Sequence, residues 1–132
     1  MKFKIDTKEK FTVISPIGEN LSDNLTAELI QIATGFLQKV IRNVVLNLKN
    51  VSSISESAAA HLVKLEQTFH ENNASFVMCE VQPSVQQKFN EYDFEFRNIT
   101  PTESEAWDIV QMEEIERELM SDEGFNNFDK DE

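Results

Sequence analysis

Glycine, cysteine and proline are scarce in this sequence, and their scarcity excludes several kinds of functional site. The three glycines, Gly18, Gly35 and Gly124, lie too far apart to form a loop that cradles a phosphate. Cys79 is the only cysteine, so the chain can form neither an internal disulfide nor a cluster of thiolate metal ligands. Because its neighbours in residues 76–79 are apolar, we expect a buried and unreactive thiol.

Basic residues and long apolar runs are also scarce. The 132 residues include 12 Lys or Arg against 24 Asp or Glu, a net charge of −12. Because nucleic-acid-binding surfaces are basic, direct nucleic-acid binding is not expected. The apolar run at 41–48 is far shorter than the ~20 residues of a membrane helix, and residues 1–10 lack the apolar core of a secretory signal. We therefore expect a cytoplasmic protein that does not insert into membranes.

The remaining composition favours one α/β domain. Hydrophobic residues make up 40% of the chain, including 10 Phe, which is enough for a core. Their spacing changes repeatedly between two and about 3.6 residues, as expected for alternating strands and helices. Five strands are predicted: a hairpin of residues 3–5 and 11–17, a central buried strand at 44–48, a strand at 75–80, and a strand around Phe94 and Phe96 within 92–99.

Four helices are predicted from capping residues and apolar stripes. The first begins after Ser22 or Asp23, and a short third helix has Pro83 in its first turn. Thr102 and Glu105 form the capping-box pattern at the start of the last helix. The expected inward faces are Leu25, Leu29, Ile32 and Phe36 in the first helix, Ala58, Leu62, Leu65 and Phe69 in the second, Val85 and Phe89 in the third, and Ala106, Ile109, Val110 and Ile115 in the last, which extends from about Glu103 to Leu119.

Negative charge is concentrated at the C-terminal end. Residues 113–132 hold nine acidic and two basic side chains, against 15 and 10 in the rest of the chain. Residues 121–132 contain no aliphatic residue and no apolar stripe, which is typical of a frayed tail. We therefore divide the chain into a domain of residues 1–120 and an acidic, flexible tail of residues 121–132. Phe125 and Phe128 leave open a second role for this tail as a docking segment.

No residue pattern typical of an enzyme is present. His61 and His70 are nine residues apart on the second predicted helix, about two and a half turns, so they do not share one metal ion. We expect both imidazoles at the surface. Acidic pairs such as Glu113 with Glu114 are expected to be solvated rather than catalytic. We therefore expect no catalytic residue, no bound metal and no cofactor.

The turn into the second helix, residues 54–58, is the best candidate for a functional site. In parallel sheets, ligands and partners are met at turns that lead from a strand into a helix, and helix N-termini favour anions. A phosphate would therefore be well placed at this turn. The alternative is that Ser55 or Ser57 serves only as the N-cap of the helix, which is a common role of serine.

The order of these elements and the residues of this turn resemble the STAS domain of anti-sigma factor antagonists. In that family a buried strand is followed by a lead-in that begins with valine, the motif Asp-Ser-Ser-Gly, and a helix bearing leucine. Here the strand is 44–48, residues 51–54 match the lead-in, residues 55–58 occupy the four motif positions, and Leu62 continues the helix.

Two further segments are similar to recurring parts of the family. Residues 18–29 resemble the entry to the first helix, with one extra residue, and residues 101–106 resemble the entry to the last helix. The resemblance covers about residues 2–112. It implies a STAS-like single α/β domain with a mixed central sheet of about five strands and about four helices, followed by the acidic tail.

Three of the four motif positions depart from the family. Ser55 replaces the aspartate, Glu56 replaces the first serine and Ala58 replaces the glycine, whereas Ser57 keeps the serine that the resemblance marks as the phosphorylation site. A phosphoserine would add about −1.5 to −2 charges beside the permanent charge of Glu56. Two outcomes are open: either Ser57 is a switch, or Glu56 makes the surface constitutively acidic.

The resemblance implies a regulator without catalytic activity. Such a protein binds an anti-sigma factor or a related serine kinase and releases it on phosphorylation at Ser57, which is known as partner switching. The alternative is a STAS scaffold subunit that is not phosphorylated and belongs to a transporter or stress-signalling complex. The expected partner-binding residues are Asp23, Ser55, Glu56, Ser57, Ala58 and His61.

Overall fold

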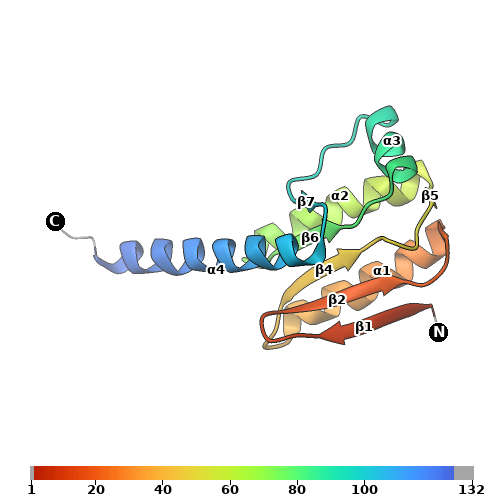
Figure 1. Cartoon of the computed structure of the whole chain (residues 1–132). Coiled ribbons are helices and arrows are strands. Elements are labelled where there is room, and N and C mark those ends of the chain that lie inside the picture. Colours follow the sequence, from red (N-terminus) through yellow and green to blue (C-terminus); the bar gives the residue numbers. More distant parts are fainter. Residues whose placement is uncertain (1, 127–132) are drawn as a thin grey trace.

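The computed structural model describes residues 2–126, with side chains to residue 119, and a five-stranded sheet lies at its centre (Figure 1). In spatial order the strands are β1 (Phe3–Thr7), β2 (Phe11–Pro16), β4 (Asn43–Asn47), β6 (Phe76–Cys79) and β7 (Ile99–Thr100). β1 is antiparallel to β2, whereas the other neighbouring strands are parallel. The predicted mixed sheet, its opening hairpin and its central strand are therefore confirmed.

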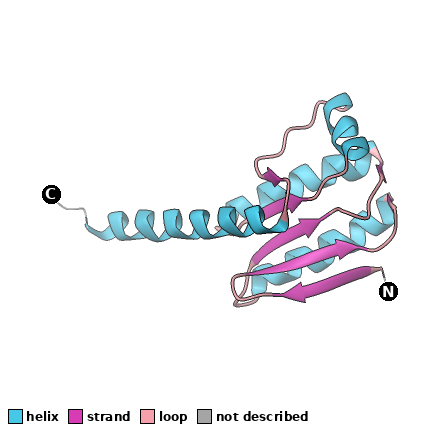
Figure 2. Cartoon of the chain, in the orientation of Figure 1, coloured by secondary structure: helices cyan, strands magenta, loops and turns pink. Residues whose placement is uncertain are grey.

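Helices cover both faces of this sheet (Figure 2). α1 (Asp23–Gly35) and α2 (Glu56–Glu71) pack against each other on one face, and α3 (Pro83–Glu91) joins the same core. α4 (Glu103–Asn126) packs on the opposite face, while a short 3-10 helix, η1 (Phe36–Gln38), follows α1. The four predicted helices are therefore confirmed.

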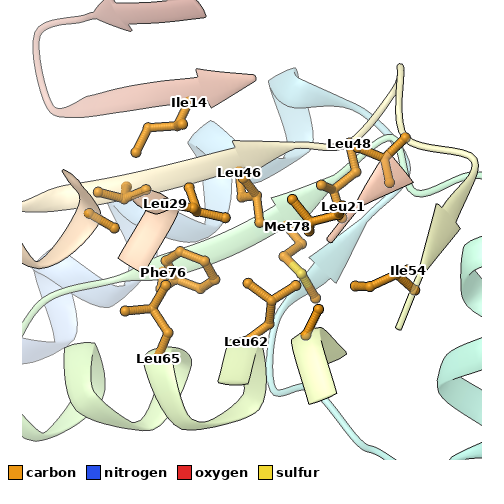
Figure 3. Close-up of a cluster of buried hydrophobic side chains, with 14 of the residues drawn as sticks. Ile14, Leu21, Leu29, Leu46, Leu48, Ile54, Leu62, Leu65, Phe76 and Met78 are labelled. Atoms are coloured by element: carbon orange, nitrogen blue, oxygen red, sulfur yellow. The ribbon is translucent and has the colours of Figure 1, made fainter. Parts of the chain in front are cut away.

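Alternating side chains of each strand divide the interior into two cores. Val44 and Leu46 of β4 face α1 and α2, whereas Val45 between them faces α4. The alternation has a period of two because successive side chains of a strand point to opposite faces of the sheet. Figure 3 shows part of the larger core, between the sheet and α2. The smaller core consists of Phe11, Val13, Val45, Val77, Cys79, Ala106 and Val110.

β3 (Asn20–Leu21) and β5 (Ser53–Ile54) form a separate two-stranded parallel sheet that the apolar patterns do not predict. Leu21 pairs with Ile54, and both side chains are buried. α1 begins two residues after Leu21, and α2 begins two residues after Ile54. The short strand pair therefore brings the N-terminus of α1 beside the N-terminus of α2.

The predicted strand around Phe94 and Phe96 is wrong, because β7 contains only Ile99 and Thr100. α3 is followed by Asp93, whose φ of 61° is in the left-handed region, and the backbone N–H of Phe94 donates to the carbonyl of Phe89. The chain therefore turns back over α3 instead of extending. The Phe96 ring packs against the Phe89 ring with centroids 4.6 Å apart, so these aromatic residues serve the core without forming a strand.

A buried side chain replaces strand pairing in the next part of this segment. The carboxylate of Glu66, on α2, accepts hydrogen bonds from the backbone N–H groups of Arg97 and Asn98 at 2.7 and 2.9 Å. Glu66 itself is 6% exposed. Because backbone N–H groups that are not paired in a strand still need acceptors, this carboxylate stabilises an irregular path where the sequence predicts a strand.

Thr102 caps the start of α4 as predicted, but the end of the helix and one inward residue differ from the prediction. The Thr102 hydroxyl oxygen accepts a hydrogen bond from the Glu105 N–H at 3.2 Å. Ala106 and Val110 are buried and Ile109 is partly buried, whereas Ile115 is 54% exposed. Ile115 faces outward because Glu113 and Arg117, two residues before and after it, turn toward the sheet.

The helix does not end at Leu119, as the sequence suggested, but at Asn126, so residues 121–126 of the expected tail are helical. Residues 127–132, which include Phe128, lie outside the described part of the chain, and the division at residue 120 stays a prediction. Within residues 2–126, no helix has both the length and the apolar character needed to span a membrane.

Candidate functional site

Ser55 forms the N-cap of α2 and links this helix to α1. Its hydroxyl oxygen accepts a hydrogen bond from the Ala58 N–H at 3.0 Å, and its backbone is extended, with φ −80° and ψ 160°. The same hydroxyl donates a 2.6 Å hydrogen bond to Oδ1 of Asp23. The N-cap alternative for this turn is therefore confirmed for Ser55, which also connects two of the predicted site residues.

α1 begins in the same way as α2. Ser22 is its N-cap and accepts a hydrogen bond from the Leu25 N–H at 3.2 Å. In each helix the serine is followed by an exposed acidic residue, Asp23 in α1 and Glu56 in α2. Because carboxylates near a helix N-terminus interact favourably with the helix dipole, both acids stabilise the helix starts. The site is thus a pair of serine-capped helix N-termini held side by side.

Ser57 is the second residue of α2, and its side chain is exposed. Ser57 is not the N-cap, so the structural role that explains Ser55 does not explain it. The first N–H groups of a helix have no intrahelical acceptor, and they favour an anion at this end. A phosphate on the Ser57 hydroxyl would project into solvent beside these donors and would require no rearrangement of the core.

His61 lies one turn after Ser57 and is exposed as predicted. Its Nδ1–H donates a 2.7 Å hydrogen bond to the Ser57 carbonyl oxygen. This bond holds the ring against the first turns of α2, on the same exposed surface as Ser57. His70, the other histidine, is exposed near the C-terminal end of the helix and takes no part in this site.

Ala58 contributes to the site in a different way from its neighbours. Its side chain is 0% exposed, as is that of Ala59, and it packs in the larger core. Small side chains allow the first turn of α2 to approach the neighbouring elements, as the sequence predicts. Because the whole residue is buried, Ala58 lies beneath this surface and shapes it without being open to direct contact with a partner.

The exposed residues of this surface carry negative charge. The carboxylates of Glu56 and Asp23 both lie at helix N-termini, where the partial positive charge of the helix offsets part of their repulsion. A phosphate on Ser57 would bring a third anionic group to the same surface. The arrangement can therefore change its charge strongly without any change in fold.

The described residues offer no alternative site for metal or thiol chemistry. Among them, no group of three or more His, Cys, Asp or Glu side chains is placed to hold a metal ion. Cys79 is 0% exposed, and burial raises the pKa of its thiol to about 12, with smaller effects from the carboxylates of Glu80 and Glu103. The expected buried, inert thiol is confirmed.

A family model provides the first comparison with known proteins. The STAS domain model matches residues 3–106, which include the sheet, α1, α2 and α3 and the first turn of α4. No curated protein matches this chain significantly by sequence.

Solved structures provide the second comparison. A putative anti-sigma factor antagonist from Thermotoga maritima is 20% identical, with a TM-score of 0.71 over 83% of this chain and 94% of its own. The anti-sigma factor antagonist SpoIIAA in its unphosphorylated form is 21% identical, with a TM-score of 0.66 over 83% and 96%. The phosphorylated form of SpoIIAA, from Bacillus, also matches, at a TM-score of 0.61, 16% identity and coverage of 82% and 98%.

The same fold occurs in a much larger protein. The murine anion transporter Slc26a9 is 11% identical, with a TM-score of 0.64 over 81% of this chain but only 18% of the transporter.

Proposed function

The chain belongs to the STAS domain family, and from this we propose that it is an anti-sigma factor antagonist-like regulator in the cytoplasm. It binds an anti-sigma factor or a related serine kinase through the paired helix N-termini. The surface consists of Asp23, Ser55, Glu56, Ser57 and His61, and the buried Ala58 supports it from beneath. No catalysis by this chain is required, because the regulator acts by occupying its partner.

The observation that carries this proposal is the contrast between Ser55 and Ser57. The Ser55 hydroxyl is engaged with Asp23 and the Ala58 N–H, whereas the Ser57 side chain is exposed on the second residue of α2. A kinase can reach Ser57 without unfolding the helix. The likeness of the fold to SpoIIAA, which is known in unphosphorylated and phosphorylated forms, supports the same interpretation.

Phosphorylation at Ser57 would release the partner by electrostatics and desolvation. A phosphoserine adds about −1.5 to −2 charges at neutral pH. Buried in an interface beside Glu56, this charge would have to lose its hydration, and the flanking residues 50–63 contain no Lys or Arg to pair with it. The unmodified protein therefore sequesters its partner, and the phosphorylated protein lets it go.

Phosphosite mapping by mass spectrometry tests this switch on protein isolated from its native cells, during growth and during starvation. We expect occupancy at Ser57 to differ between the two conditions and Ser55 to remain unmodified. A Ser57 that is unmodified in both, on a well-covered peptide, contradicts the switch.

Binding measurements with charge-mimicking variants separate the charge from its position. The Ser57→Asp variant is expected to lose a partner recovered with the wild type, and Ser57→Ala to retain it. Ser104→Asp is a matched control, because Ser104 is also exposed, also the second residue of its helix and also preceded by a glutamate. Retention of the partner by Ser57→Asp, at wild-type affinity, would show that Ser57 is not a switch.

Glu56 supports a second candidate function, that of a STAS scaffold subunit which is not phosphorylated. Its exposed carboxylate gives the surface a permanent charge next to Ser57. In a transporter or stress-signalling complex, such a subunit would need no switch. Both Ser57→Ala and Ser57→Asp would then keep the partner, whereas Glu56→Lys would lose it.

A further inference from the structure

α4 carries an apolar stripe on the side that faces away from the sheet. Met112, Ile115 and Leu119 are 62%, 54% and 57% exposed. They are spaced by three and four residues, which places all of them on one side of a helix. Figure 1 shows the C-terminal half of α4 reaching beyond the ends of the strands, and the exposed fractions of the three side chains show that the stripe is open to solvent.

Polar contacts on the opposite side of α4 fix the rotation of the helix. Glu113 accepts hydrogen bonds from the Ser75 hydroxyl at 2.5 Å and from Nδ2 of Asn98 at 2.8 Å. One turn later, Arg117 donates to the Ser75 hydroxyl oxygen at 3.3 Å. Glu113 and Arg117 therefore lie on the same side of α4 as the buried Ala106 and Val110. The stripe therefore faces outward because the other side of the helix is held to the sheet.

The spacing of the stripe matches one heptad of a coiled-coil seam. If Met112 and Leu119 are assigned to heptad position a, Ile115 falls at position d, and the two positions that border the seam, e and g, are Glu116 and Glu118. Both glutamates are exposed. Arg117, the only basic residue between Glu103 and Asn126, faces the sheet, so no cation borders the seam.

We propose that this seam, defined as Met112, Ile115 and Leu119 bordered by Glu116 and Glu118, binds an amphipathic helix of a partner protein whose apolar seam is bordered by Lys or Arg. The residues at e and g set which helices pair, because they lie opposite the e and g residues of the other helix. A second copy of this chain would supply no cation to these glutamates: antiparallel pairing places glutamate opposite glutamate, and parallel pairing places Gln111 opposite Glu116. A basic helix would form ion pairs in either arrangement.

This seam is separate from the paired helix N-termini. α2 begins after the carboxyl end of β4, whereas α4 contacts Ser75 and Asn43 at the start of β6 and β4. The two surfaces therefore lie toward opposite ends of the sheet. The proposal does not depend on the function of Ser57, and the chain can hold two partners at once.

A synthetic peptide of about three heptads, with leucine at a and d and lysine at e and g, is the probe. Its binding to the full chain is measured by fluorescence anisotropy, beside a peptide of the same composition in scrambled order and a peptide with glutamate at e and g. We expect the lysine heptad peptide to bind about tenfold more tightly than either control peptide.

Variants of the full chain test each part of the seam. Glu116→Lys with Glu118→Lys is expected to reverse the preference, so that the glutamate peptide binds about tenfold more tightly than the lysine peptide. Glu9→Lys with Glu95→Lys makes the same change in net charge at exposed sites elsewhere and is expected to keep the wild-type preference. Met112→Gln with Ile115→Gln and Leu119→Gln is expected to abolish binding of both peptides.

Three results would overturn the proposal. Equal binding of the heptad and scrambled lysine peptides would mean non-specific charge attraction only. An unchanged preference in the Glu116→Lys, Glu118→Lys variant would show that these residues do not select the partner. Self-association of the wild-type chain in sedimentation experiments, lost with the three glutamine substitutions, would identify a second copy as the occupant.

Discussion

The Ser55 hydroxyl donates a 2.6 Å hydrogen bond to the Asp23 carboxylate and joins the first turns of α2 and α1. Its oxygen also accepts the Ala58 N–H, so one small side chain caps its own helix and holds a second helix beside it. The bond to Asp23 is charge-assisted, a type of hydrogen bond that is shorter and stronger than a neutral one. The replacement of the family's aspartate by Ser55 thus still supplies a capping oxygen.

Ser55→Ala is therefore expected to destabilise the fold by about 1–2 kcal/mol, because it removes an N-cap and a side-chain hydrogen bond. The free energy of unfolding is measured by urea titration followed by circular dichroism. Ser57→Ala is the control and should change the stability by less than about 0.5 kcal/mol, since its side chain is exposed and makes no cap. Equal effects of the two substitutions would contradict the assignment of the cap to Ser55.

Local patterns were sufficient to predict most of the fold. The capping serine before α1, Pro83 at the start of α3 and the Thr102 cap of α4 depend on neighbours within a few residues, and all three are confirmed. The apolar residues 44–48 likewise predict the central strand, even though the sequence does not show which strands pair with it. For the candidate site, the sequence predicted the residues but could not decide which serine caps α2.

Long-range contacts account for what the sequence did not predict. β3 and β5 exist because Leu21 pairs with Ile54, residues 33 positions apart whose pairing no local pattern contains. The segment after α3 is shaped by Glu66, about 30 residues earlier, which satisfies the N–H groups of Arg97 and Asn98. The outward position of Ile115 depends in the same way on contacts of its neighbours with Ser75, which is distant in sequence.

Cys79 is expected to be unreactive in the folded protein. Its side chain is fully buried in the smaller core, and burial raises its pKa to about 12, whereas only the thiolate reacts with disulfide reagents. A colorimetric thiol assay at about pH 8 should detect less than about a tenth of the thiol in native protein and all of it in guanidinium. Rapid reaction of the native protein would show that α4 opens readily from the sheet.

Asn43→Ala is expected to destabilise the fold by about 2–3 kcal/mol, because the buried Ser75 N–H would lose its acceptor and two partly buried acceptors would lose a donor. Asn43 is 4% exposed; its amide donates to the Lys10 carbonyl at 3.0 Å and to Glu114 at 2.7 Å, and its Oδ1 accepts the Ser75 N–H at 2.8 Å. Asn50→Ala, at an exposed position, is the control for urea titration. A loss as small as that of the control would show that these bonds are replaced by water.

Glu66 gives the stability of the protein a pH dependence that can be isolated. Burial raises its pKa above the ordinary value of 4.5, and this effect outweighs the opposing hydrogen bonds from the N–H groups of Arg97 and Asn98. The folded protein therefore binds this proton more tightly than the unfolded chain does. By linkage, the contribution of Glu66 to stability is largest below about pH 4.5 and decreases as the pH rises through the higher pKa of the folded state.

Glu66→Gln makes this contribution measurable, because glutamine is uncharged throughout the range. The free energy of unfolding of the wild type minus that of Glu66→Gln is expected to fall as the pH rises above about 4.5 and to become constant once the pH has passed the raised pKa of the folded state. Glu71→Gln, which removes an exposed carboxylate from the same helix, measures the background effect of losing one charge. A difference that rises with pH would mean that the backbone hydrogen bonds to the Glu66 carboxylate outweigh its desolvation, and that the segment after α3 is held by a charged group.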